Sequence, residues 1–432
     1  MTYISNTALN DSASRLRRSL RGTCVIVGLS VLTLVAAGCG GGTTGGTTGA
    51  GSAGNEVTFG LIVPLSGANA SVGEQSRNAA ELAVADINKA GGIKSLGGAQ
   101  VKLQVEDSTN EPQGARNASE RMLSQGKISG AFGLDLSPLC TASLPVFIRK
   151  HVPLVGACIS DTLVTADNGG YYFQIAPKGS AFGEQQVKFL TFLNTEYHMG
   201  LTKAAILYVD NPYGQSTEAG IEKLAAKAGL DIVLKAAYPE TITDASPLAT
   251  KIAASGAQVL FPVSYIVDGQ QILSALKAAN SHVVVVGGGA GFIWPPIGKA
   301  LGDQVNGLIS VASWNFDSKN VSTNNDLVDV TTRYKAQFGT FMPEQAGEAY
   351  AGIQALASAA EKAKSTDSQK IRDALSTIDI TVGGATLMQP GQVRFDEHGA
   401  NALAVPVMIQ WQAGVPKTVF PPELATAQVQ RP

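Results

Sequence analysis

The sequence predicts an α/β protein with two lobes, each a doubly wound parallel sheet. Three observations favour this fold class: short apolar runs rich in β-branched residues alternate with helical patterns, the alternation occurs in two halves of similar length, and Gly makes up 48 of 432 residues. Strands buried in parallel sheets read as continuous apolar runs. A repeated βα order indicates a parallel sheet with helices on both faces, and glycines serve the many turns of such a fold.

The first half of the body begins with a strand at 57–64, an apolar run followed by Gly67. A helix is expected at 74–90, because Leu82, Ala83 and Ile87 lie at helical spacing before a glycine pair. The rest of this half is predicted as strands at 100–106, 130–134, 152–156 and 172–175 and helices at 112–125 and 138–150.

The βα rhythm then starts again and predicts a second lobe of similar size. Its helices are expected at 181–197, 213–228, 247–255 and 269–279, and its strands at 204–209, 232–238, 259–263 and 283–286. A strongly helical stretch at 344–364 and late strands at 393–395 and 405–411 follow. We expect this tail to complete both lobes, so the chain would pass between them more than once.

Residues 1–38 are typical of an export signal. Four arginines within residues 15–21 precede fourteen uncharged residues at 24–37 and small residues before Cys39. Fourteen residues are too few to span a bilayer, which needs roughly 20. The run Ala36-Ala37-Gly38-Cys39 resembles the lipobox of bacterial lipoproteins, which implies that Cys39 is lipidated and becomes the new N-terminus. An ordinary secreted protein and a buried apolar helix are the alternatives, and the export route, Sec or twin-arginine, stays open.

The segment 39–55 is expected to join the lipidated Cys39 to the body as a flexible linker. Residues 40–54 are only Gly, Thr, Ala and Ser, a composition that buries too little apolar surface to fold. Such a chain lets the body range roughly 20 Å from its anchor. The expected location is the outer face of the cytoplasmic membrane, or the periplasm.

Charge and motif content exclude several classes of protein. Without residues 1–38 the chain carries 28 basic and 33 acidic residues, a net charge of −5, which disfavours nucleic-acid binding. The four His are scattered, so neither a metal site nor a cofactor is expected. The glycine-rich run at 287–291 lacks the Lys-Ser/Thr of a phosphate loop, and no Ser-His-acid set stands out, so we do not expect an enzyme.

Two cysteines, Cys140 and Cys158, remain in the body once Cys24 and Cys39 are assigned to the signal and the lipid. In an exported protein they form either a disulfide or two separate buried thiols. A disulfide would close a loop of 18 residues and stabilise the fold by roughly 3 kcal/mol in the chain-entropy model.

Seven segments, in order over nearly all of 57–411, resemble the branched-chain amino-acid-binding proteins, which are type I periplasmic binding proteins that feed ABC importers. They are FGLIVPLSG at 59–67, GEQ at 73–75, DINKAGGI at 86–93, VED at 105–107, VPLV at 152–155, ILYVDNPYGQ at 206–215 and GEAY at 347–350. The resemblance implies two lobes joined by three crossovers, near 176–179, 311–315 and 388–393, with a ligand cleft between them. The N-terminal lobe would comprise 56–177 plus 314–388, and the C-terminal lobe 178–313 plus 389–424.

The same resemblance implies a function. It predicts a monomeric solute-binding protein that closes by a hinge on a small ligand, an amino acid or related carboxylate, and delivers it to an ABC permease and ATPase complex. The alternative is a ligand sensor of the same fold that signals to a membrane receptor, which the sequence separates poorly from an importer component.

Ser137 is the first candidate for the ligand site. It follows the strand at 130–134 and precedes Pro138, so we expect it to cap a helix whose positive end favours an anion. In the family a Ser at this place binds the ligand carboxylate. The resemblance adds the loop after the next strand, with Cys158 contributing its backbone and Ser160 its hydroxyl. The alternatives are a Ser that only caps its own helix, a turn Ser and a structural thiol.

Three tyrosines match pocket-lining tyrosines of the family: Tyr213 and Tyr265 in the second lobe and Tyr350 at the lobe boundary. A tyrosine offers flat apolar area and a hydroxyl at a small entropic cost. Packing without ligand contact is the alternative for each.

Two positions depart from the family pattern. Gly289 stands at a ligand-binding position where the family has an acid that pairs with the ligand ammonium. An unpaired buried ammonium costs several kcal/mol, so either Asp135, Asp210 or Asp268 substitutes or the ligand is not an α-amino acid. Val72 replaces an aromatic residue near the first helix, and Phe-Ile-Trp at 292–294 either lays an aromatic wall on the ligand or packs as a lid.

Overall fold

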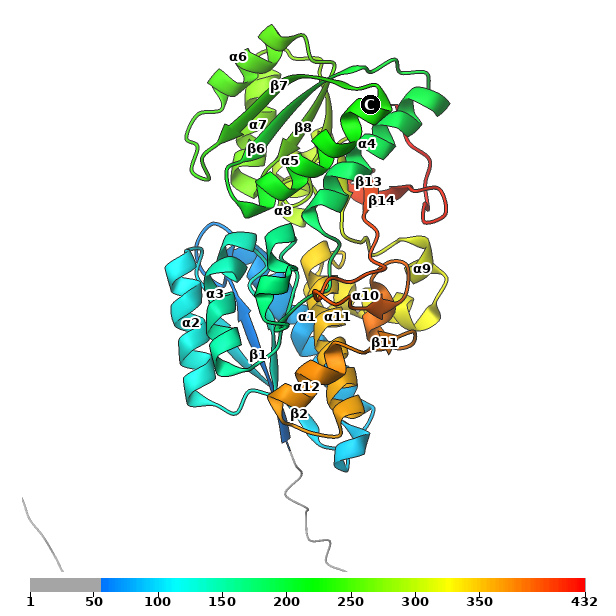
Figure 1. The fold of residues 1–432 in the computed structure, drawn as a ribbon. Helices are drawn as coiled ribbons and strands as arrows, with labels where there is room; N and C mark the ends of the chain where they lie inside the picture. The colour runs from blue at the N-terminus through cyan, green and yellow to red at the C-terminus, as the bar shows by residue number, and fades with distance from the viewer. Residues whose placement is uncertain (1–55, 432) are drawn as a thin grey trace, which may run out of the picture. The chain divides into compact units, whose positions relative to one another are not determined.

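The computed structural model describes residues 56–431. These residues form two lobes, each built on one large sheet (Figure 1). The predicted export signal at 1–38 and the predicted lipidated Cys39 with its linker at 39–55 lie outside the described residues. Within the described part of the chain, no helix is both long enough and apolar enough to cross a bilayer.

The first lobe contains a five-stranded parallel sheet with the order β2-β1-β3-β4-β5. Helix α11, from late in the chain, packs against α1 and against β3. The elements of this lobe are β1 (Glu56–Val63), α1 (Ala70–Lys89), β2 (Gln100–Asp107), α2 (Pro112–Gln125), β3 (Gly130–Gly133), α3 (Ser137–Lys150), β4 (Leu154–Gly156), β5 (Tyr172–Gln174), α9 (Lys319–Ser322), α10 (Asn325–Phe338), α11 (Glu344–Ala363), α12 (Ser368–Leu375) and the two-stranded ribbon of β11 (Asp379–Ile380) and β12 (Val393–Arg394).

Strand β1 shows why its sequence is apolar throughout. Phe59, Leu61 and Val63 pack into the cluster with α1 and α11, whereas Ile62 packs into the cluster with α2 and α3. Successive side chains of a strand point to opposite faces, so both faces of this strand are buried. The hydrophobic core of the first lobe therefore lies on both sides of its sheet.

The second lobe contains a seven-stranded sheet with the order β14-β13-β10-β9-β8-β6-β7. The pairs from β7 to β10 are parallel, while β10–β13 and β13–β14 are antiparallel. The elements are α4 (Gly179–Glu196), β6 (Lys203–Val209), α5 (Pro212–Ala225), β7 (Asp231–Tyr238), α6 (Ser246–Ser255), β8 (Val259–Val263), α7 (Ile266–Ala278), β9 (Val284–Gly287), α8 (Pro295–Leu301), β10 (Ile309–Ala312), β13 (Val407–Gln412) and β14 (Val415–Phe420).

This architecture confirms the predicted fold class of two α/β lobes with parallel sheets. The antiparallel edge made by β13 and β14 was not predicted, because a late strand at 405–411 gave no sign of its direction. Helices α8, α10 and α12 and strands β10 and β14 also escaped the sequence analysis. Helix α8 opens with Pro295-Pro296 and contains Gly298, so its residues have low helix propensity.

The chain passes between the two sheets three times. The first passage joins β5 to α4, and the second follows β10. The third lies later than the predicted 388–393, because the Ala400 backbone still bridges to Gln174 of β5 and the Asn401 N–H donates to the Gln174 carbonyl. Phe395 also packs on Phe173 of the first lobe. Residues 389–401 therefore belong with the first lobe, and the chain crosses between Asn401 and β13.

A candidate ligand site between the two lobes

Residues of both lobes line a small cavity of about 30 Å³. The first lobe contributes residues from the β3–α3 turn, the loop after β4 and the start of α11. The second lobe contributes residues from α4, from α5, from the position before α7 and from the loop before α8. The lining residues are Asp135, Leu136, Ser137, Ala157, Ile159, Glu344 and Gln345 from the first lobe and Phe182, Tyr213, Tyr265, Ala290 and Trp294 from the second. Most follow the carboxyl ends of parallel strands, where ligands bind in open α/β sheets.

The β3–α3 turn brings Asp135 and Ser137 to this cavity. Leu134 and Asp135 both have left-handed backbone angles, with φ of 78° and 54°, which cost energy for residues other than Gly. The Asp135 carboxylate accepts a hydrogen bond of 2.8 Å from the Ser76 hydroxyl. This contact with α1 holds the acid at the cavity wall.

Ser137 lies at the cavity, but it is not the helix cap that the sequence predicted. Helix α3 begins at Ser137 itself, and Leu136 takes the N-cap position. The Ser137 side chain instead accepts a hydrogen bond of 3.3 Å from the Ser160 N–H. Within residues 56–431 its own hydroxyl hydrogen has no acceptor, so it can donate to a ligand next to the positive end of α3.

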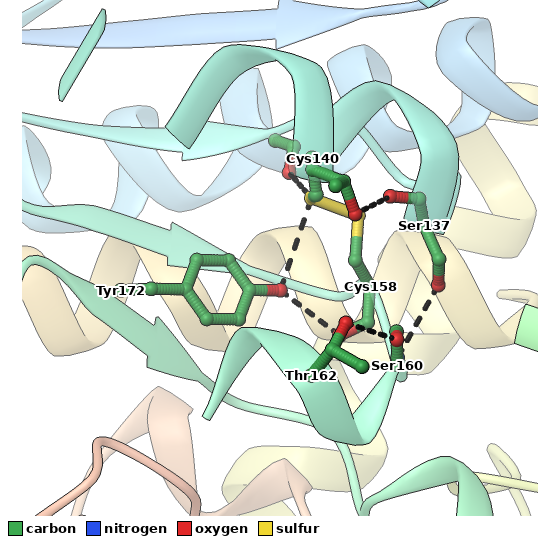
Figure 2. Close-up of a disulfide and its surroundings, with 8 residues drawn as sticks. Ser137, Cys140, Cys158, Ser160, Thr162 and Tyr172 are labelled. Carbon is green, nitrogen blue, oxygen red and sulfur yellow. Dashed lines mark hydrogen bonds between the residues drawn. A yellow bond between two sulfur atoms is a disulfide. The ribbon is translucent and has the colours of Figure 1, made fainter. Parts of the chain in front are cut away.

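Cys158 and Ser160 lie behind the cavity wall, and their neighbours Ala157 and Ile159 form the wall. Cys158 is bonded to Cys140 in a disulfide, so of the two alternatives left open the structure has the bridge (Figure 2). The Cys158 carbonyl accepts from the Tyr172 hydroxyl at 2.9 Å. The Ser160 hydroxyl lies 2.9 Å from the Thr162 hydroxyl (Figure 2) and 3.4 Å from that of Ser216. These residues fix the loop that carries the wall.

Tyr213 and Tyr265 form one side of the cavity, with ring centroids 5.2 Å apart. The Tyr213 hydroxyl donates to the Gly288 carbonyl at 2.7 Å. The Tyr265 hydroxyl accepts from the Asn211 amide at 3.3 Å. Burial raises the pKa of Tyr213 well above its usual value, so both rings act as neutral, partly apolar surfaces.

Gly289 lies just outside the cavity wall, which Ala290 completes. Its φ of +105° suits Gly, and a Cβ placed there would lie 3.4 Å from the Phe182 ring and 3.6 Å from the Tyr213 hydroxyl. A side chain at this position would thus point at two cavity-lining residues. With Gly, only the backbone remains, and its N–H donates to the Ser310 hydroxyl at 3.1 Å.

The structure places Tyr350 away from the site, in contrast to the prediction. Its hydroxyl donates to the Asp86 carboxylate at 2.7 Å, and Arg333 forms two further hydrogen bonds to the same carboxylate. Tyr350 therefore joins α11 to α1 inside the first lobe. The residues of α11 that line the cavity, Glu344 and Gln345, precede the GEAY motif at the start of the helix.

Of the three acids proposed as substitutes at the site, only Asp135 lines this cavity. Asp210 is exposed and accepts from Gln215. Asp268 accepts from the Tyr238 hydroxyl at 2.7 Å and lines an adjoining cavity of about 130 Å³. Glu344 was not anticipated, because a Glu in the first turn of a helix is ordinary and gives no sign of a site.

The two cavity acids favour their protonated forms. Burial raises the pKa of Asp135 to about 7, although the hydrogen bond from Ser76 opposes the shift. Burial likewise raises the pKa of Glu344 to about 8, with Ser313 opposing it. Glu348, one helical turn further on, has a pKa raised well above its usual value by burial and then by Glu344 and Asp135. Three carboxyl groups that interact in this way cannot all be ionised without a counter-charge.

Trp294 supplies an aromatic surface at the cavity. It lines the cavity and is 2% exposed. Trp294 and Val72 of α1 belong to one buried cluster, so residues of both lobes pack together here. Phe292, by contrast, is fully buried against Gly287, and its part in the predicted aromatic wall is structural.

Comparison with known proteins agrees with this architecture. Residues 56–412 match the family model described as periplasmic binding protein. The Leu/Ile/Val-binding protein homolog 8 of Brucella melitensis is 30% identical over 385 residues, which cover 87% of this chain and 93% of that protein.

Solved structures share the fold at lower sequence identity. The branched-chain amino acid transporter substrate binding protein LivJ from Streptococcus pneumoniae, solved with isoleucine, superimposes with a TM-score of 0.70 at 22% identity and covers 85% of this chain and 100% of its own. A solute binding protein of an ABC transporter from R. palustris, solved with benzoate, has a TM-score of 0.73 at 16% identity and covers 87% and 98%.

The family match spans most of the chain, and the fold, the two-lobe cavity and the curated relative agree with it. Family members of this kind bind solutes and do not catalyse reactions. The chain therefore belongs to the type I periplasmic binding proteins, in the branched-chain amino-acid (Leu/Ile/Val)-binding family of ABC transporters.

Proposed function

We propose that this chain is the lipid-anchored, extracytoplasmic solute-binding protein of an ABC importer, and that it binds a small carboxylate-bearing ligand, an amino acid or a relative of one, by hinge closure. The observation that carries the proposal is the cavity whose wall comes from both lobes. A ligand held there contacts each lobe, so it binds the closed arrangement better than an open one and shifts the population toward closure.

The carboxylate is assigned to the Ser137 end of the cavity. Ser137 has a free hydroxyl hydrogen at the N-terminal end of α3, a helix of 14 residues, and such an end favours an anion. The ligands of the two solved relatives, isoleucine and benzoate, have a carboxylate in common. Tyr213, Tyr265 and Phe182 give the remainder of the ligand an apolar and aromatic surface.

The cavity between the lobes is too small for an amino acid unless the lobes first move apart. A volume of about 30 Å³ is close to the share of one water molecule in the liquid, whereas ligand pockets usually measure hundreds of Å³. An amino acid can therefore enter only after the lobes separate. Delivery to the permease would follow from recognition of the closed form.

A thermal-shift experiment tests the site. The purified protein and the double variant Ser137→Ala/Tyr265→Ala are heated with and without a panel of amino acids and small carboxylates that includes isoleucine and benzoate. We expect at least one panel member to raise the melting temperature of the wild type and none to raise that of the double variant. The matched control is Tyr350→Phe, which removes a hydroxyl that bonds to Asp86 outside the cavity and should keep the full ligand response.

Two results would count against the proposal. A ligand response that survives in the double variant removes the site assignment. A ligand response that is lost in Tyr350→Phe would return that residue to the site. The lipid anchor has its own test, because Cys39→Ser should abolish labelling of the exported protein with a fatty acid, and continued labelling would refute lipidation at Cys39.

A further inference from the structure

Four polar atoms at the cavity wall have no hydrogen-bond partner within the described residues: Asp135 Oδ1, Glu344 Oε2, Gln345 Oε1 and Trp294 Nε1. The residues that carry them are at most 9% exposed. Buried polar groups in folded proteins are nearly always paired, and leaving one unpaired costs about 1–3 kcal/mol. Four such atoms around one cavity therefore indicate that a ligand supplies the partners.

Three of these four atoms are oxygens, which need a hydrogen-bond donor from the ligand. In their ionised forms the two carboxyl groups accept hydrogen bonds, as the Gln345 amide oxygen does, and only the Trp294 N–H donates. Two of the acceptors belong to acids. A ligand that satisfies them needs several N–H groups at one place, which is what an ammonium group offers.

Acidic residues also line the adjoining cavity of about 130 Å³. It shares Leu136 and Tyr265 with the first and adds the acids Glu111, Glu240 and Asp268. Neither Lys, Arg nor His occurs among the described residues that line the two cavities. An approach lined by one sign of charge attracts ligands of the opposite sign.

We propose that the ligand carries an ammonium group and that Asp135 and Glu344, both in the first lobe, bind it, in place of the second-lobe acid whose position Gly289 occupies. The inference rests on the proposed function and narrows its ligand to amine-bearing compounds. It also explains how a chain with Gly289 retains an amino-acid site: the counter-charge has moved to the opposite lobe.

A metal ion does not account for the acids equally well. In the part of the chain that the structure describes, no group of three or more His, Cys, Asp or Glu side chains is placed to hold a metal. The unpaired Trp294 N–H is a donor, which a metal ion cannot satisfy and the carboxylate of an amino acid can.

Proton release should accompany binding. Burial raises the pKa of Asp135 to about 7 and of Glu344 to about 8, and an adjacent cation lowers such values. The groups that face the pair are Ser76, Ser313, Glu348, Tyr172 and Tyr213, of which none is cationic. At pH 7 an ammonium would therefore displace a proton to the buffer.

The test compares compounds that share one carbon skeleton. L-leucine, 4-methylpentanoate and 3-methylbutylamine carry respectively both charged groups, the carboxylate alone and the amine alone, and equivalent sets follow from other amino acids. We expect thermal stabilisation by the amino acid of at least one set and none by its deaminated acid. Calorimetry of that amino acid at pH 7 in phosphate and in Tris, which differ in heat of ionisation, should show proton release.

Isosteric variants test the two residues. Asp135→Asn and Glu344→Gln should each weaken binding of the amino acid by about 30-fold or more, since truncating a buried charge pair is costly, and should reduce proton release. The exposed Glu423→Gln is the control and should change neither. Because the amides keep the shape of the acids, both variants should fold, which their unfolding transitions will show.

The outcomes separate this inference from the proposed function. If a deaminated acid stabilises the protein as well as its parent amino acid, the ammonium site is refuted and the carboxylate-binding function stands. If an amine without a carboxylate suffices, the ammonium site stands and the proposed carboxylate ligand is refuted. Unchanged affinity and proton release in both isosteric variants overturn the inference, and silence from every set contradicts both proposals.

Discussion

Asp135, Glu344 and Glu348 are buried carboxyl groups, and the described cavity wall beside them holds no basic side chain. Asp135 keeps its place through Ser76 and through a turn of two left-handed residues. A chain without a use for these acids would be more stable with apolar residues here, because an unpaired buried charge is costly. The ammonium group proposed above would supply the counter-charge that these acids lack.

The acids make stability depend on pH in an unusual direction. The pKa of Glu344 is raised from its ordinary value of 4.5 to about 8 in the folded state, so between these two values the folded state holds a proton that the unfolded state has lost. Stability must then fall as pH rises through this window. Glu344→Gln should remove roughly 3 kcal/mol of the loss between pH 5 and pH 8, as measured by urea unfolding without ligand.

The exposed Glu423→Gln is again the control, and it should leave the pH profile unchanged. A Glu344→Gln protein whose stability falls with pH as steeply as that of the wild type would show that the Glu344 carboxyl is ionised in the folded state.

At this scale, sequence reasoning could name candidates only where a residue has a family counterpart, and their contact with a ligand stays a prediction. Ser137, Tyr213 and Tyr265 lie at the cavity, because motif positions at the ends of strands keep their place in the fold. Tyr350 lies outside this cavity, because a motif match does not tell which way a helical residue points. The sequence analysis did not predict that Glu344, Gln345 and the Trp294 N–H line the cavity. Their place there depends on which surfaces of the two lobes meet, and no local sequence pattern shows that.

At the scale of elements, helices α4 and α5 cross at very short range in the second lobe. A Cβ at Gly183 would lie 2.1 Å from the Thr217 carbonyl oxygen, and one at Gly220 would lie 1.9 Å from that of Ser180. Glycines normally weaken helices, so here they serve the close approach. The crossing packs the start of α4 against α5. Helix α4 follows the first passage between the lobes, and α5 carries Tyr213.

Gly220→Ala should therefore destabilise the protein, although Ala favours helices by about 1 kcal/mol. A methyl group pressed against backbone forces the helices apart, and such overpacking costs about 1–3 kcal/mol beyond that gain. Ala219→Gly, at an exposed position of the same helix, measures the propensity term alone. Urea unfolding of both variants checks this, and a Gly220→Ala protein more stable than the wild type would contradict the close crossing.

Element prediction succeeded where pattern and boundary signals coincided. The helix at 112–125 and the strand at 259–263 have the predicted limits, since a Pro starts the first and a five-residue apolar run fills the second. Strand β14 was missed because Pro416 and Lys417 interrupt its apolar residues. The late third crossover was missed because the backbone pairing of Ala400 with Gln174 joins residues distant in sequence.

At the scale of the whole molecule, bonds between the lobes gather beside the first passage of the chain. The Asp161 carboxylate accepts from the Ser180 N–H at 3.0 Å and from its hydroxyl at 2.6 Å, while the Asp161 N–H donates to the Ser216 hydroxyl at 3.1 Å. Asp161 precedes the passage, and Ser180 and Ser216 lie beyond it. In the proposed closure we expect these bonds to persist, because they lie beside a passage of the chain between the lobes.

Small-angle scattering of the purified Cys39→Ser protein, recorded with and without a saturating amino acid identified by the thermal screen, tests the central claim most directly. The account predicts that the ligand lowers the radius of gyration of this protein. When Asp135→Asn is added, the radius of gyration at the same ligand concentration should stay at its ligand-free value. A ligand that binds tightly while the radius of gyration stays the same would contradict closure of the two lobes around it.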